Sequence, residues 1–166
     1  MPEVKGFRGW RYDRVSVGHL SAVVAPPYDV ISKEEQETLY RQSPYNVIRL
    51  ILGKKKAGDT PGSNQYTRAR KFLNEWKLSG VLVQDSQESI YAYMQDYREE
   101  GRARRRIGFI AAMRLDEAAV LRHENTLAAP KKDRLALLKE VRTNLSPIFG
   151  LFEDKSGAVQ KILKDA

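Results

Sequence analysis

The sequence contains no cysteine and only two histidines, His19 and His123. The lack of cysteine excludes a disulfide framework, a thiolate nucleophile and a cysteine-based metal site. Two histidines are too few for a histidine-rich zinc site. No apolar run approaches the ~20 residues that a membrane-spanning helix needs, and the first ten residues lack the apolar centre of a signal peptide. We therefore expect a soluble, cytoplasmic protein without a metal site or membrane partner.

The common catalytic signatures are missing as well. The chain has no G-x-x-x-x-G-K-[ST] phosphate loop, no G-x-G-x-x-G dinucleotide fingerprint and no G-x-S-x-G nucleophile elbow. His123-Glu124 is followed by Asn125-Thr126-Leu127, so the second histidine of a metalloprotease H-E-x-x-H motif is absent. These absences exclude the enzyme classes that these four motifs identify.

What is present is enough for one ordinary hydrophobic core. The chain has 166 residues, of which 42% are hydrophobic and 30% charged, and its net charge is +8. A positive balance of this size raises the chance of a polyanionic partner. Five of the arginines lie close together, at positions 98, 102 and 104–106, around Glu99 and Glu100.

The hydrophobic pattern predicts an α+β fold with a mixed, largely antiparallel sheet and helices packed on it. Ser32 before Glu35 is typical of a helix N-cap, and Gly80 is typical of a helix C-terminus. Helices are predicted at residues 32–42, 64–79, 130–144 and 154–166. Strands are predicted at 4–12, 46–52, 81–83, 89–97, 104–115 and 148–152, of which 46–52 and 148–152 are expected to be buried.

Two of these strands, 89–97 and 104–115, form a predicted hairpin with an arginine-rich tip. Tyr91, Tyr93 and Tyr97 share one face of the first strand because they alternate with apolar residues. Arginines beside a row of tyrosines can bind single-stranded nucleic acid. Charged side chains can also simply protect a sheet edge from aggregation. We favour edge protection, because glutamates interrupt the basic patch.

The start of the predicted helix after Pro130 is the first candidate binding site. Lys131 and Lys132 stand where the helix dipole is already positive, and such a helix end suits a phosphate or a carboxylate. The alternative to an anion site is that both lysines simply point into water. His123-Glu124 just ahead can do acid–base chemistry, although most such pairs are surface neighbours.

Two further positions are candidates. Pro26-Pro27 fixes an extended loop that ends in Tyr28 and Asp29, and this loop can line a site or serve as an ordinary connector. Arg49 lies within the apolar run 46–52, where an unpaired charge is costly. Its partner is either an internal carboxylate or a bound anion, and we favour the internal ion pair.

Several motifs in this order carry a family resemblance. They are VVAPPYDVIS (23–32), SPYNVIRLILGK (43–54), YTRA (66–69), RRRIGFIA (104–111), HENT (123–126), PKKDRLALL (130–138) and NLSPIFGLF (144–152). Together they resemble the bacterial and archaeal family named domain of unknown function 1015. The resemblance covers essentially the whole chain.

The resemblance implies that residues 1–166 form the N-terminal portion of a single family domain. Members are longer, and their second half carries an Asp-Gly-His-His-Arg motif that this chain lacks. The fold is therefore expected to be incomplete without that half. An exposed apolar patch along the sheet or the last helix would then be expected.

The same missing motif occurs in free-serine kinases related to the ParB and sulfiredoxin fold, where it helps to hold nucleotide phosphates. Those kinases also carry a His-Glu pair ahead of a helix. By this similarity Glu124 would be the base acting on a serine hydroxyl, and His123 would support it. ATP or ADP with Mg²⁺ would be the phosphoryl donor. Asn125 and Thr126 would orient the substrate, and Lys131, Lys132 and Arg134 would face phosphate or carboxylate.

The sequence therefore leads to three hypotheses. The first is a nucleotide-dependent kinase of free serine or a similar small hydroxy compound, with Tyr28, Asp29 and Arg49 as further candidates for binding the substrate or phosphate. The second is a nucleic-acid-associated, ParB-like binding protein. The third is a fragment without independent activity.

Overall fold

The computed structural model describes residues 2–115, 120–121 and 127–165, and it divides the chain into two compact units. Unit 1 comprises residues 1–9, 85–123 and 147–166. Unit 2 comprises residues 10–84 and 124–146. Short antiparallel sheets accompany the helices, so the predicted α+β class is confirmed. In the described part of the chain, no helix is long and apolar enough to span a membrane.

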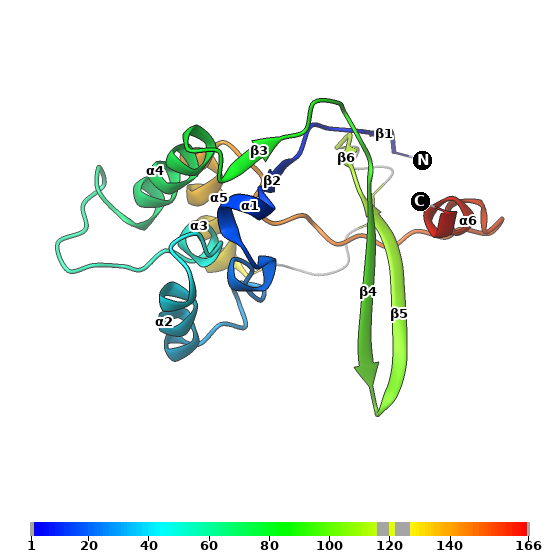
Figure 1. The fold of residues 1–166 in the computed structure, drawn as a ribbon, viewed down its shortest axis with the longest axis horizontal. Helices are drawn as coiled ribbons and strands as arrows, with labels where there is room; N and C mark the ends of the chain where they lie inside the picture. The colour runs from blue at the N-terminus through cyan, green and yellow to red at the C-terminus, as the bar shows by residue number, and fades with distance from the viewer. Residues whose placement is uncertain (1, 116–119, 122–126, 166) are drawn as a thin grey trace. The chain divides into compact units, whose positions relative to one another are not determined.

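Unit 2 is mainly helical (Figure 1). Its only sheet among the described residues pairs two short antiparallel strands, β2 (Trp10–Tyr12) and β3 (Leu82–Gln84). The helices are α1 (Arg14–Val17), the 3₁₀ helix η1 (Leu20–Ala22), α2 (Lys33–Gln42), α3 (Ile48–Ile51), α4 (Gln65–Leu78) and α5 (Ala128–Val141).

Helices α2 and α4 each begin at a side chain that caps them. The Ser32 side chain accepts the N–H of Glu35 at 3.1 Å, so α2 begins where the sequence predicts. The Asn64 side chain accepts the N–H groups of Tyr66 and Thr67, and the Thr67 hydroxyl oxygen accepts the N–H of Asn64. Helix α4 ends just before Gly80, whose φ of 75° suits a glycine after a helix.

The core of unit 2 is built on the apolar face of α4. Ala69, Leu73 and Trp76 are buried there, as their helical spacing predicts. The Trp76 ring contacts the rings of Tyr12, Tyr45 and Phe72, with centroids 6.1–6.3 Å apart. Leu50, Val81, Leu82, Leu137 and Val141 complete the cluster. Helices α3 and α5 and strand β3 are therefore held together by burial against α4.

The predicted strand at residues 46–52 is wrong, because this segment forms the short helix α3. Ile48, Leu50 and Ile51 are all buried, and a short apolar run of this kind fits a buried helix as well as a buried strand. The deciding contacts come from the buried Asn46. Its side-chain oxygen accepts the N–H of Ile48, and its amide donates to the carbonyls of Ala22 and Val24, at 2.9–3.0 Å.

Unit 1 contains the predicted hairpin (Figure 1). Strand β4 (Tyr91–Glu99) pairs antiparallel with β5 (Arg102–Ile110), and β1 (Val4–Lys5) pairs with β6 (Ala112–Met113). Glu100 and Gly101 connect β4 to β5 with φ of 49° and 79°, as a two-residue hairpin turn of type I′ requires. Helix α6 (Ala158–Asp165) contacts β5.

The predicted buried strand at residues 148–152 is also wrong. The segment has no regular structure, and Ile148 and Leu151 are 93% and 87% exposed. The apolar run predicts burial only if another apolar surface covers it, and every buried hydrophobic residue among the described residues belongs to unit 2. Apolar side chains of the hairpin and of α6, among them Met94 and Ile162, are exposed.

The contrast between the two units gives a stability prediction. Leu73 is 2% exposed in the core of unit 2, whereas Leu151 is 87% exposed in unit 1. Leu73→Ala should lower the free energy of unfolding by about 2–5 kcal/mol, because it removes buried methyl groups and leaves a cavity. The same change at Leu151 should alter it by less than about 0.5 kcal/mol. Urea unfolding of both variants measures the difference, and equal effects would contradict the placement of the core.

Tyr12 gives a prediction of pH dependence. Burial raises the pKa of its hydroxyl well above the ordinary value, and the hydroxyl donates to the carbonyl of Tyr45 at 2.8 Å. The folded state therefore keeps this proton at a pH where the unfolded chain loses it. The contribution is fully present below about pH 10 and is lost as the pH rises further, by up to about 1.4 kcal/mol per pH unit.

Urea unfolding between pH 9 and pH 11 tests this expectation. Tyr12→Phe should remove that part of the pH dependence. Tyr93→Phe, a matched change on the exposed hairpin, should leave it in place. An unchanged slope in Tyr12→Phe would contradict the prediction.

Candidate functional site

The predicted catalytic residues fall on a stretch that the structure does not describe. His123, Glu124, Asn125 and Thr126 all lie outside the described residues. Their roles therefore stay predictions from the sequence. The chain resumes at Leu127, the N-cap of α5, so the candidate base lies three residues before a helix start.

The beginning of α5 is exposed and carries positive charge. Its N-cap Leu127 has no side chain that could accept a hydrogen bond, and no acidic residue stands in the first turn. Among the described residues, no side chain caps the N–H groups of the first turn, and their dipoles favour an anion. The side chains of Lys131 and Lys132 are exposed just behind this turn. The helix begins two residues before the predicted Pro130, and the lysines lie in its first part, as predicted.

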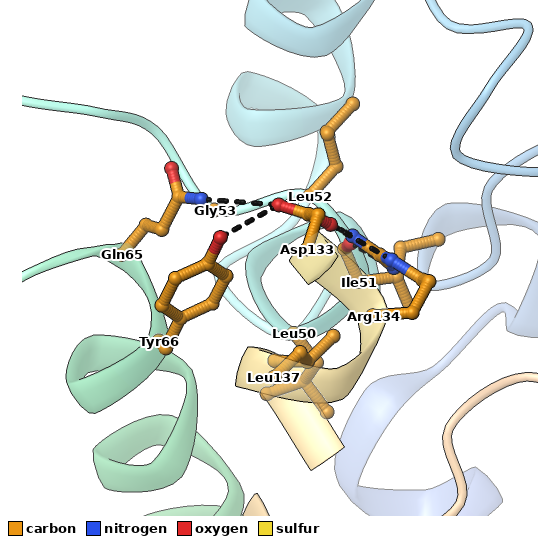
Figure 2. A pocket seen from close by; sticks show the side chains of 9 residues that line it. All are labelled: Leu50, Ile51, Leu52, Gly53, Gln65, Tyr66, Asp133, Arg134 and Leu137. Atoms are coloured by element: carbon orange, nitrogen blue, oxygen red, sulfur yellow. Dashed lines mark hydrogen bonds and ion pairs between the residues drawn. The ribbon is translucent and has the colours of Figure 1, made fainter. Parts of the chain in front are cut away.

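The next residue, Asp133, joins α5 to α4 (Figure 2). Its carboxylate accepts the hydroxyl of Tyr66 at 2.7 Å and the side-chain amide of Gln65 at 3.5 Å. It also accepts two N–H groups of Arg134. Burial raises the pKa of the Tyr66 hydroxyl, and the hydrogen bond to Asp133 raises it further. The carboxylate thus fixes the first part of α5 against α4.

Arg134 brings two of the predicted site residues together. Its guanidinium carbon lies 3.8 Å from the centroid of the Tyr28 ring, so the extended loop and α5 meet at this point. One N–H of Arg134 donates to the carbonyl of Ile51 at 2.8 Å, and two donate to Asp133. Three of the five guanidinium N–H groups thus donate to groups of the chain, and the other two make no hydrogen bond within the described residues.

A small cavity lies between α3, α4 and α5 beside these groups (Figure 2). Its volume of about 10 Å³ is enough for roughly one water molecule. A nucleotide needs a cleft of several hundred Å³. Any ligand of α5 must therefore bind at the exposed helix start and not inside this cavity. The lining residues are Leu50, Ile51, Leu52, Gly53, Gln65, Tyr66, Asp133, Arg134 and Leu137.

Arg49 has a different environment. Its guanidinium lies 4.4 Å from the Tyr40 ring centroid and 5.7 Å from that of Phe72, and it donates to the carbonyl of Tyr40 at 2.7 Å. Its buried Nε has no hydrogen-bond partner among the described residues. Within that part of the chain no carboxylate pairs with Arg49, so the expected internal ion pair is not formed by the described residues. Asp29 is exposed in its loop.

The described ranges contain no group of three His, Asp or Glu side chains that could hold a metal ion. If Mg²⁺ enters with a nucleotide, the phosphates and water would supply most of its ligands, which is common for this ion. The exposed lysines and the positive end of the α5 dipole have the charge that phosphate oxygens require. The described residues thus fit a phosphate better than they fit a metal ion by itself.

The contact between Arg134 and Tyr28 can be measured by a double-mutant cycle with Arg134→Met and Tyr28→Leu. The coupling free energy should be about 0.5–2 kcal/mol, because the cation lies against the ring at a partly buried site. The control cycle combines Tyr28→Leu with Arg70→Met, since Arg70 pairs instead with Glu140 at 2.9 Å. Its coupling should be near zero. Equal coupling in both cycles would contradict a specific contact.

The family model described as "Protein of unknown function (DUF1015)" matches residues 4–166, so the match includes both units. No curated protein and no solved structure matches the chain. The resemblance carried by the sequence motifs is confirmed, whereas nothing in these comparisons supports the remote likeness to ParB- and sulfiredoxin-related kinases. The chain belongs to the DUF1015 family of proteins of unknown function.

Proposed function

We propose that this chain supplies the base and a phosphate-binding helix start of a phosphotransferase that acts on free serine or a similar small hydroxy compound. The observation that carries the proposal is the beginning of α5. There, a helix N-terminus that no described side chain caps and the exposed Lys131 and Lys132 directly follow the segment that contains His123 and Glu124. The candidate base and the candidate anion site are therefore adjacent along the chain.

Each side chain has a defined task in the proposed reaction. The serine hydroxyl oxygen forms a bond to the transferred phosphorus, and the bond from this phosphorus to the bridging oxygen of the nucleotide breaks. Glu124 accepts the hydroxyl proton, and His123 supports Glu124. Asn125 and Thr126 orient the substrate. Phosphoryl transfer depends mainly on positioning and on spreading negative charge, and the two lysines and the helix dipole act on that charge.

The contacts behind the helix start serve to hold it in place. Asp133 and Arg134 fix α5 to α4 and to the carbonyl of Ile51, and Tyr28 packs against the Arg134 guanidinium. In the proposal, the two unused N–H groups of Arg134 and the exposed Asp29 are available to the substrate. In the proposal, Arg49 has a supporting role, and its guanidinium packs against the Tyr40 ring. ATP or ADP with Mg²⁺ is the proposed donor.

The test is formation of phosphoserine by the complete natural protein that contains these residues. The protein is incubated with free serine, Mg²⁺ and either ATP or ADP. Glu124→Gln should lower kcat by roughly 10²–10⁴-fold, because proton transfer loses its acceptor. The double variant Lys131→Gln/Lys132→Gln should raise the KM for nucleotide several-fold, because two cations leave the helix start.

Lys139→Gln is the matched control for the lysine variants. Lys139 is exposed on the last turn of the same helix, so the change removes the same charge at the opposite helix end. Its KM should stay at the wild-type value. If the wild-type protein forms no product with either nucleotide, the serine assignment is wrong. If Glu124→Gln retains full activity, Glu124 is not the base.

A further inference from the structure

The strand register of the hairpin in unit 1 puts its tyrosines and three of its five arginines on the same face. Residues directly opposite in an antiparallel pair share a face, and Tyr97 lies opposite Arg104 while Gln95 lies opposite Arg106. We name this surface the tyrosine face. Its members are Tyr91, Tyr93, Gln95, Tyr97 and Glu99 on β4, and Arg102, Arg104, Arg106, Gly108 and Ile110 on β5.

Tyr93 presents an open ring at the middle of the tyrosine face. The residue opposite is Gly108, which has no side chain to cover the ring. Tyr93 is 41% exposed, although it lies within a regular strand. A flat and accessible aromatic ring of this kind is the element on which a nucleic-acid base stacks.

Arg106 and Arg105, which lie on opposite faces of the hairpin, make different contacts. On the tyrosine face, Arg106 lies over the Tyr97 ring at 5.3 Å and donates to Gln95 at 3.2 Å, and it also lies over Phe149 at 5.0 Å. On the opposite face, Arg105 makes two hydrogen bonds to Asp96, at 2.6 and 2.9 Å.

The charge of the tyrosine face is positive. It has three arginines and a single carboxylate, Glu99, which lies 3.3 Å from Arg104. The opposite face has two arginines, Arg98 and Arg105, and the carboxylate of Asp96. Arg102, Arg104 and Arg106 alternate along β5, so their backbone positions are about 6.8 Å apart, twice the rise of a strand. A row of cations at this spacing can follow the phosphates of an extended chain.

We propose that the tyrosine face binds single-stranded nucleic acid. A base stacks on Tyr93, and the neighbouring phosphates pair with Arg102, Arg104 and Arg106. A duplex fits poorly, because its bases are already stacked on one another and do not offer a free face to a tyrosine. The net charge of +8 adds a long-range attraction to the same polyanion.

This inference goes beyond the proposed phosphotransferase and does not depend on it, because it uses only residues of unit 1. It also differs from simple protection of the sheet edges. Protection requires charge near an edge, but it does not require an open aromatic ring or a difference between the two faces. The two explanations can therefore be separated by experiment.

The experiment measures fluorescence anisotropy of a labelled 12-nucleotide oligo-dT with the full chain and its variants, over a series of salt concentrations. Tyr93→Ala should weaken binding about tenfold, as expected for the loss of one stacked base, whereas Tyr93→Phe should bind as wild type does. Arg102→Gln and Arg106→Gln should each lower the slope of log K against log salt by about 0.7. Arg98→Gln removes the same charge on the opposite face and should change the slope by less. Circular dichroism checks that each variant keeps the wild-type fold.

Three results would overturn the proposal. The first is no binding of oligo-dT at low salt. The second is an equal loss of affinity in Arg98→Gln and Arg106→Gln. Binding would then depend on the total positive charge of the hairpin and not on which face carries it. The third is that the chain forms an oligomer, and that Tyr93→Ala dissociates this oligomer without changing oligo-dT binding. The tyrosine face would then be a contact between protein chains.

Discussion

Burial of the apolar face of α4 is the interaction on which the rest of unit 2 depends. Trp76 and Leu73 on this face belong to a cluster with residues of α3, α5 and β3, and the α5 residues in this cluster, Leu137 and Val141, lie in the second half of the helix. The hydrogen bond from Tyr66 to Asp133 adds a polar contact at the edge of the same packing. The exposed lysines of α5 therefore lie on a helix that is packed against α4, and a binding site is more precise on such a helix than on a loop. Unit 1 has no buried hydrophobic residue among its described residues, so its hairpin is held by strand pairing and by exposed contacts such as those of β5 with α6 and of Phe109 with Phe152.

The elements that the sequence predicts correctly have local signals at their ends. Ser32 starts α2, Gly80 follows α4, and the alternation of Tyr91, Tyr93 and Tyr97 marks β4. The two wrong strands, 46–52 and 148–152, are short apolar runs without such signals. Periodicity cannot separate a buried helical turn from a buried strand over so few residues. The first becomes helical through bonds from Asn46 to residues more than twenty positions away, and the second is exposed because nothing described in unit 1 covers it.

The candidate site is predictable only in part. Helix-dipole reasoning finds Lys131 and Lys132, because their position follows from the helix start alone. The contact of Tyr28 with Arg134 joins residues over a hundred positions apart, and the sequence offers them only as separate candidates. The role of Tyr66 is missed. Its spacing on α4 is that of a core residue, and this spacing does not predict that its hydroxyl donates to Asp133. Arg49 is expected to meet a carboxylate, whereas two aromatic rings and a backbone carbonyl meet it instead.

The central claim is that the beginning of α5 binds phosphate. The most direct measurement is a nuclear magnetic resonance titration of the ¹⁵N-labelled chain with ADP and, separately, with inorganic phosphate. The claim predicts saturable shifts of the backbone amides of Ala128, Ala129, Lys131 and Lys132, with the amides of the last turn of α5 unmoved. Shifts confined to other parts of the chain, or none at millimolar ligand, would contradict it.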